Sequence, residues 1–140
     1  MGTNLKFNSV ICTSREQSER LLALGLKKET ADMSYRIPYF DFDGMLLECI
    51  HTLEPDPPFN NDRFIPAWSL NRLIEMMPNE IFYEDSTLIL GVFGDGVYYA
   101  DNEYGEVFKS FDGNLYDCVV KCIEWLIKEG YFNKEYLEEL

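Results

Sequence analysis

The stretch LYDCVVKCIEWLIKEG, residues 115–130, decides the fold class of this chain. Its apolar side chains recur every three or four residues, as they do along one face of a helix. Asp112 or Asn114 begins this helix, and Gly130 ends it. A helix with so broad an apolar stripe must be covered by a sheet. The stripe comprises Leu115, Cys118, Val119, Cys122 and Leu126, and is widened by Ile123 and Ile127.

Three β-rich runs, residues 87–93, 96–100 and 106–111, come directly before this helix and predict the sheet that it covers. The sequences GDG and DNEYG separate the runs, and both supply the turn residues of hairpins. The region therefore predicts a three-stranded antiparallel meander.

The first half of the chain predicts a helix and a hairpin. The spacing of a capping box occurs as Thr13 with Glu16 and as Ser14 with Gln17, and a helix is expected over residues 14–24. Gly25 then supplies its left-handed stop. Residues 33–37 alternate and residues 45–50 are apolar, so the segment 33–50 predicts a hairpin whose turn is Asp43-Gly44.

Residues 54–66 carry four prolines and predict a loop, because each proline removes a donor and restricts the residue before it. A second helix follows, with Leu70, Leu73, Ile74 and Met77 on one face and Pro78 at its end. Asn133 caps a short tail helix. The expected fold is α+β, a single domain over residues 1–140: an antiparallel sheet, made of the hairpin and the three-stranded meander, packed against about three helices.

Charge excludes some classes of partner. The 140 residues include 25 acidic and 12 basic side chains, a net charge of −13. Residues 79–140 hold 14 acidic and 4 basic residues, whereas residues 1–78 hold 11 and 8. Nucleic acids and anionic membranes bind Lys and Arg, so neither is an expected partner. The sequence has no apolar run long enough to span a bilayer, and its first residues lack the apolar core of a signal peptide. A cytoplasmic location is therefore expected.

The stretch DFDG, residues 41–44, resembles the aspartate motif of the haloacid dehalogenase-like phosphatases. The resemblance implies a metal-dependent phosphohydrolase with Asp41 as nucleophile and Asp43 as acid/base near a magnesium ion, with Asp95 and Asp101 somewhat like a later metal-binding motif. Met45 stands where that family usually has threonine. We therefore favour a tight turn and keep the phosphohydrolase as an alternative.

Four side chains are candidate metal ligands: Cys49, His51, Cys118 and Cys122. Zinc takes about four such ligands. The spacing of Cys118 and Cys122 lets both point at one ion, but both also lie in the apolar stripe of the last helix. Buried free cysteine behaves as a small hydrophobic residue, so we interpret them as core and predict no metal and no cofactor.

The aromatic side chains of the second half alternate with acidic residues, which argues against a stacking platform for single-stranded nucleic acid. We expect a small non-enzymatic protein-interaction module, with self-association left open. An acidic mimic of nucleic acid, inhibiting a DNA-binding enzyme, is an alternative. The candidate partner-binding residues are Trp68, Tyr98, Tyr99 and Tyr104. Trp68 has a second interpretation, as a side chain that covers the proline-rich loop.

The segments FIPAWSLNRLIEMMP, residues 64–78, and YDCVVKCIEWLIKEGYF, residues 116–132, flank the meander. Together they resemble a set of short uncharacterised proteins of gut-bacterial and phage genomes. The resemblance implies an accessory protein of a mobile element and transfers no catalytic residue.

Overall fold

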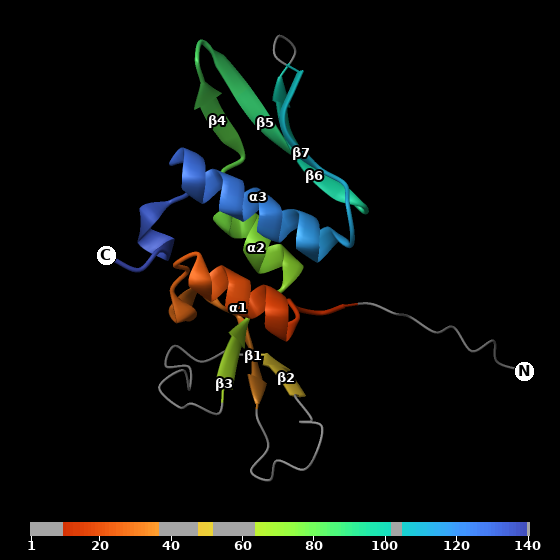
Figure 1. The fold of residues 1–140 in the computed structure, drawn as a ribbon, viewed down its shortest axis with the longest axis vertical. Helices are drawn as coiled ribbons and strands as arrows, with labels where there is room; N and C mark the ends of the chain where they lie inside the picture. Colours follow the sequence, from red (N-terminus) through yellow and green to blue (C-terminus); the bar gives the residue numbers. More distant parts are fainter. Residues whose placement is uncertain (1–9, 37–47, 52–63, 102–104, 140) are drawn as a thin grey trace, which may run out of the picture.

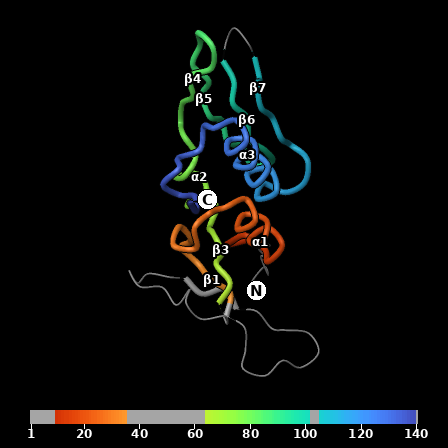
Figure 2. Tube along the Cα trace, turned by 60° about the vertical axis from the view of Figure 1, so that its left-hand side comes forward, coloured from red at the N-terminus to blue at the C-terminus, as the bar shows by residue number. Residues whose placement is uncertain are grey.

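The computed structural model describes residues 10–36, 48–51, 64–101 and 105–139 (Figure 1). It gives an α+β fold with three α-helices and two separate antiparallel sheets. The helices lie between the sheets, and Figure 2 shows the same order from another side. The bounds of the helices are α1 Arg15–Ala23, α2 Leu70–Met76 and α3 Leu115–Glu129, with 3-10 turns at Lys28–Thr30 and Lys134–Tyr136.

The helix ends follow from local sequence. Ser14 caps α1, since its hydroxyl accepts from the Gln17 backbone N–H at 3.1 Å while the Gln17 side chain accepts from the Ser14 N–H at 2.8 Å. Ser14 with Gln17 is therefore the capping box of the two that the sequence allowed. Of the two predicted starts, Asp112 and Asn114, it is Asn114 that caps α3, and Gly130 ends the helix at φ 80° as predicted. Asn133 caps the tail turn as predicted, although that turn is 3-10.

The smaller sheet has the strand order β2-β1-β3, with bounds β1 Met33–Arg36, β2 Glu48–His51 and β3 Phe64–Ala67. Strands β1 and β2 pair antiparallel, as the hairpin prediction required, with Arg36 opposite Glu48. The predicted turn Asp43-Gly44 lies outside the described residues. A two-residue turn at Asp43-Gly44 with an uninterrupted ladder would place Arg36 opposite His51. The observed partner of Arg36 is Glu48, so the register of the hairpin differs by three residues from the one that this turn alone predicts.

Strand β3 corrects the loop prediction, because residues 64–66 belong to the strand that pairs with β1. Pro66 lies opposite Ser34 within it. Proline cannot donate to a ladder, which confines it to edge strands, and β3 is an edge of this sheet. The expectation that a proline-rich segment forms no regular structure applies to central strands, and it was wrong here because β3 is an edge strand.

The larger sheet has the strand order β4-β5-β6-β7. The predicted meander is confirmed as the last three of its strands, and Gly94-Asp95 forms the turn between β5 and β6 as predicted. Strand β4 was not predicted. The turn before β5 has Glu84 at φ 54°, a left-handed conformation that the sequence does not mark with glycine. The bounds are β4 Glu80–Tyr83, β5 Ser86–Phe93, β6 Gly96–Asp101 and β7 Gly105–Ser110.

The main core lies where α3 packs on β6 and β7. The predicted α3 stripe supplies its helical side, and Leu88, Val97 and Tyr99 supply its sheet side.

Residues 25–27 are hydrogen-bonded to the tail, because the Lys27 N–H donates to the Tyr136 carbonyl at 2.9 Å and the Glu138 N–H donates to the Gly25 carbonyl at 2.7 Å. Within the described part of the chain, no helix has the length and apolar character to cross a membrane.

Candidate functional site

The outer face of the larger sheet exposes large apolar side chains. Successive strand residues point to opposite faces, so the side of the sheet that does not meet α3 receives Phe82, Ile89, Phe93 and Tyr98. Phe82 is 84% exposed, Ile89 58% and Phe93 51%. Helix α3 packs on β6 and β7 from the opposite side, where Tyr99 lies against Trp125. We call these four side chains, together with Phe111, the aromatic face.

Three rings of the aromatic face, those of Phe93, Tyr98 and Phe111, contact one another. Tyr98 stacks on Phe93 with ring centroids 5.6 Å apart and planes 17° from parallel. Phe111 lies 6.2 Å from Phe93 between centroids. Such contacts restrict the orientations of the three rings.

Two glycines let the rings lie flat on the sheet. Gly91 lies opposite Tyr98, and a Cβ added there would come within 2.2 Å of the Tyr98 ring. A Cβ added at Gly96 would come within 2.4 Å of both the Phe111 ring and the Ser110 carbonyl oxygen. Because glycine has no Cβ, the Tyr98 and Phe111 rings can lie directly over the backbone at these two positions.

We expect Gly96→Ala to lower the free energy of unfolding by about 1–3 kcal/mol, because the new methyl group meets backbone at Ser110 as well as a ring. Gly91→Ala should cost less, since the outer part of the half-exposed Tyr98 ring can turn away into water. Urea denaturation of both variants measures the difference. Equal losses would show that the Ser110 carbonyl does not constrain position 96.

Carboxylates surround the aromatic face. The sheet and its turns carry the exposed acidic residues Glu80, Glu84, Asp85, Asp95 and Glu106, which we call the acidic rim. The only lysine or arginine in residues 80–111 is Lys109, and its ammonium lies 3.5 Å from the Glu106 carboxylate. The potential over this face is therefore negative, which attracts cationic partners and repels phosphate backbones.

Two of the four predicted partner-binding residues are core residues. Trp68 and Tyr99 are both 0% exposed, so neither offers a surface to a partner, and their assignment to one is wrong for this fold. Tyr98 does lie on the exposed outer face, half-buried beside Phe93. Tyr104 lies outside the described residues. The alternation of strand residues could have identified Phe82, Ile89 and Phe93, had the side covered by α3 been known.

The candidate metal ligands of α3 are buried thiols. Cys118 and Cys122 are both 0% exposed, as the core interpretation required. Burial raises the pKa of Cys122 from 9.0 to about 12, which keeps the thiol protonated, whereas a metal binds the thiolate. The side chains of Cys49 and His51 lie outside the described part of the structure. Among the residues that are described, no three metal-binding side chains come together.

The structure also bears on the aspartate motifs. Asp41 and Asp43 lie outside the described residues, but the strands that flank them, β1 and β2, are antiparallel. The phosphatase resemblance implies a parallel strand followed by a helical crossover. Asp95 lies in the turn before β6 and Asp101 at its far end. Six residue steps along the strand place them roughly 20 Å apart, too far to share one ion.

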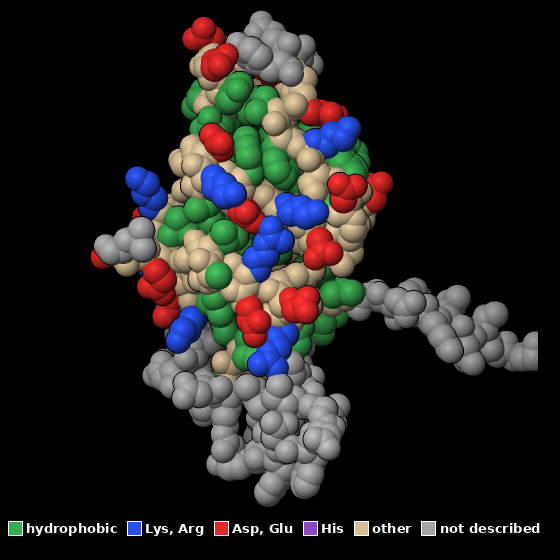
Figure 3. Space-filling view, viewed as in Figure 1, with side chains coloured by type: hydrophobic (Ala, Val, Ile, Leu, Met, Phe, Trp, Pro, Cys, Tyr) green, Lys and Arg blue, Asp and Glu red, His purple; other side chains and the backbone are tan. Residues whose placement is uncertain are grey.

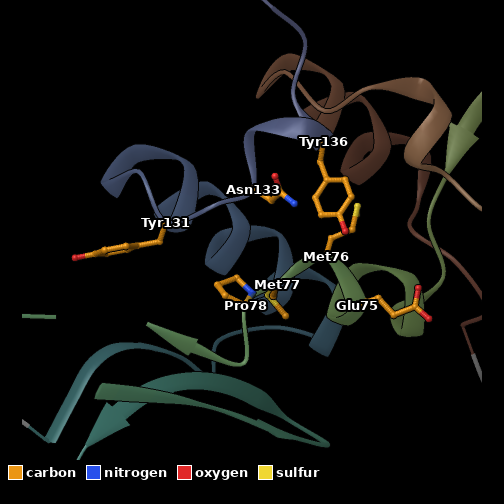
Figure 4. Close-up of a pocket in the computed structure, with 7 residues that line it drawn as sticks. All are labelled: Glu75, Met76, Met77, Pro78, Tyr131, Asn133 and Tyr136. Carbon is orange, nitrogen blue, oxygen red and sulfur yellow. The ribbon is translucent and has the colours of Figure 1, made fainter. Parts of the chain in front are cut away.

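An open groove lies between the end of α2 and the tail (Figure 4). Its volume is about 260 Å³. Tyr136 lies beside Met76, whereas Tyr131 points away from both, and the Arg72 guanidinium lies 5.9 Å from the centroid of the Tyr136 ring. The polar side-chain groups of the groove are one carboxylate, one amide and two tyrosine hydroxyls. The lining residues are Glu75, Met76, Met77, Pro78, Tyr131, Asn133 and Tyr136.

A second hollow of about 300 Å³ lies where α1 meets α3. Lys and Arg side chains gather on this side of the molecule (Figure 3). Glu124 accepts from Arg20 at 2.5 Å and pairs with Lys128 at 3.2 Å, and these hydrogen bonds hold the pKa of Glu124 below its usual value. We call this site the basic hollow, lined by Arg20, Lys121, Glu124, Trp125 and Lys128.

No family model matches the chain, and no curated protein or solved structure matches it either.

Proposed function

We propose that this protein is a non-enzymatic interaction module that binds a basic partner protein through the aromatic face. The observation that supports the proposal is the 84% exposure of Phe82 on a sheet face that also exposes Ile89 and Phe93. Isolated exposed apolar residues are ordinary on protein surfaces, but a contiguous group with a polar rim is typical of an interaction site.

The apolar side chains would supply most of the affinity. Removing a large apolar side chain from water contributes about 1.5–3 kcal/mol. Phe93 and Tyr98 are already stacked, so the entropy lost in ordering them on binding offsets little of this free energy. Aromatic residues at the centre of an interface commonly dominate its binding energy.

The acidic rim would select the partner. Carboxylates around an apolar centre favour a surface whose lysines and arginines surround apolar side chains of its own. Such rim charges act mainly on the rate of association, and salt screens them over a Debye length of about 8 Å at physiological ionic strength. Association with the partner should therefore slow as salt is added, while dissociation changes less.

We expect Phe82→Ser and Ile89→Ser each to weaken binding of the partner at least about tenfold, a loss of about 1.4 kcal/mol. Ile11→Ser is a matched control, because Ile11 and Ile89 are both 58% exposed and Ile11 precedes α1, outside the larger sheet. The measurement is capture from nuclease-treated lysate by the four immobilised chains, followed by titration of the purified captured protein against each.

The proposal requires one captured protein that the wild type and Ile11→Ser retain and that Phe82→Ser and Ile89→Ser lose. The rate at which that protein associates with the wild type must also fall as salt is added. A protein retained equally by all four chains would count against the aromatic face. Thermal unfolding of each variant separates a binding effect from a folding defect, because an 84% exposed ring contributes little to stability.

A further inference from the structure

The basic hollow gathers positive charge around one aromatic ring. Lys121, Trp125 and Lys128 lie on one face of α3, at spacings of four and three residues, and Arg20 reaches the same place from α1. Glu124 pairs with both Arg20 and Lys128, whereas Lys121 has no ion pair within the described residues. The hollow therefore keeps a net positive charge within a strongly acidic chain.

Trp125 is fixed by its neighbours. Its ring stacks on Phe108 with centroids 5.1 Å apart, and it lies 5.7 Å from the rings of both Tyr99 and Tyr131. A ring that lines the hollow and is held by several neighbours loses little freedom when a partner covers it.

The tip of the β4–β5 hairpin has the opposite chemistry. Phe82 is 84% exposed there, and Glu80, Glu84 and Asp85 stand around it. Glu80 precedes it on the same side of β4, while the other two form the turn. The tip is thus an apolar side chain among three carboxylates, and the hollow is a recess lined by one aromatic ring, three cations and one carboxylate.

We infer that the chain associates with a second copy of itself, the hairpin tip of one copy entering the basic hollow of the next. This inference rests on the proposed function of the aromatic face: although the chain as a whole is acidic, the cationic surface that its hairpin tip meets is the basic hollow of a second copy. Charge complementarity supports it, since the acids around Phe82 meet Arg20, Lys121 and Lys128. A recess of about 300 Å³ is at the lower limit for a small ligand and suits one aromatic side chain.

Because the tip and the hollow are different surfaces, their contact is heterologous. Each added copy leaves one tip and one hollow free, so assembly can continue beyond a dimer or close into a ring. The net charge of −13 on each copy opposes this assembly, so association depends on protein concentration.

The test is sedimentation velocity over a concentration series in physiological salt, on the full chain and on two variants. Wild type should sediment faster as concentration rises. Phe82→Ser removes the apolar side chain of the tip and Lys121→Glu reverses the unpaired charge of the hollow, so each variant alone should sediment as one chain. Mixed together they should form a dimer that grows no further, because one retains a hollow and the other a tip. Ile11→Ser should behave as wild type.

Several results would overturn the inference: a wild type that stays a monomer throughout, a Phe82→Ser chain that still assembles, or a mixture that does not pair. A monomeric wild type whose aromatic face still captures a basic protein would reject self-association alone. Loss of both behaviours would reject the proposed function as well. Thermal unfolding of Lys121→Glu confirms that the variant is folded.

Discussion

Replacing Trp68 with alanine is expected to lower the free energy of unfolding by about 3–5 kcal/mol, the usual cost of emptying a buried tryptophan site. Trp68 is 0% exposed and belongs to the main core. Its indole N–H donates to the Thr30 hydroxyl at 3.0 Å, and its backbone N–H donates to the Thr13 hydroxyl at 3.1 Å. Residue 68 therefore joins the segments before and after α1 to the start of α2, and the alanine variant keeps the backbone contact with Thr13 but loses the indole contact with Thr30.

Urea denaturation measures the effect, with Phe82→Ala as the comparison. Phe82 is 84% exposed, so its removal should change stability by less than about 0.5 kcal/mol. Trp68→Phe should fall between them, since it keeps most of the apolar volume but loses the indole donor. A Trp68→Ala chain of nearly normal stability and weakened binding would return Trp68 to the partner surface.

The second large effect is expected in alkali. Burial raises the pKa of Cys122 from 9.0 to about 12, and burial followed by the nearby Cys122 raises the pKa of Tyr99 above its usual 10.0. The unfolded chain releases these protons at the ordinary values, while the folded chain retains them. The stability that the neutral groups contribute is complete below pH 9 and is lost as pH rises from 9 toward 12.

The free energy of unfolding should fall by about 1.4 kcal/mol per pH unit for Cys122 above pH 9, and by about as much again above pH 10 for Tyr99. Urea denaturation at several pH values measures the slope. Cys122→Ala should reduce it, whereas Val119→Ala, an equally buried change on α3 without a titrating group, should not. Identical slopes in both variants would contradict the assignment to Cys122.

The Tyr99 hydroxyl also has a structural role that the sequence could not show. It donates to the Pro78 carbonyl at 2.6 Å, just after α2. Tyr99→Phe would leave that acceptor without its partner, so we expect a loss of about 1–3 kcal/mol at neutral pH. Thermal or urea unfolding at pH 7 measures it. A loss below about 0.5 kcal/mol would mean that water replaces the hydroxyl.

The helices were largely predictable because their signals are local. Ser14, Asn114 and Gly130 act within one turn of the helix that each begins or ends. The two strands that escaped prediction had conflicting or missing local signals. Pro66 argued against β3, and Glu84 closes the turn before β5 without a glycine.

The candidate site was less predictable than the fold. Adjacent residues of a strand point to opposite sides, so Tyr98 and Tyr99 were known to separate, but not which one would be buried. That choice depends on the side of the sheet that α3 covers, and Tyr99 packs against Trp125 of that helix. The basic hollow joins Arg20 to residues about a hundred positions later, a pairing without any local signature.

The sequence by itself determined the α+β class, the candidate caps of α1 and α3, the Gly94-Asp95 turn of the meander and the excess of negative charge. Each depends on neighbours within a few residues or on composition. Only the tertiary structure decided which aromatic residues form the core, which remain on the outer face of the larger sheet, and which cations meet. The physical reason is that burial and long-range charge pairing depend on how the helices pack against the sheets.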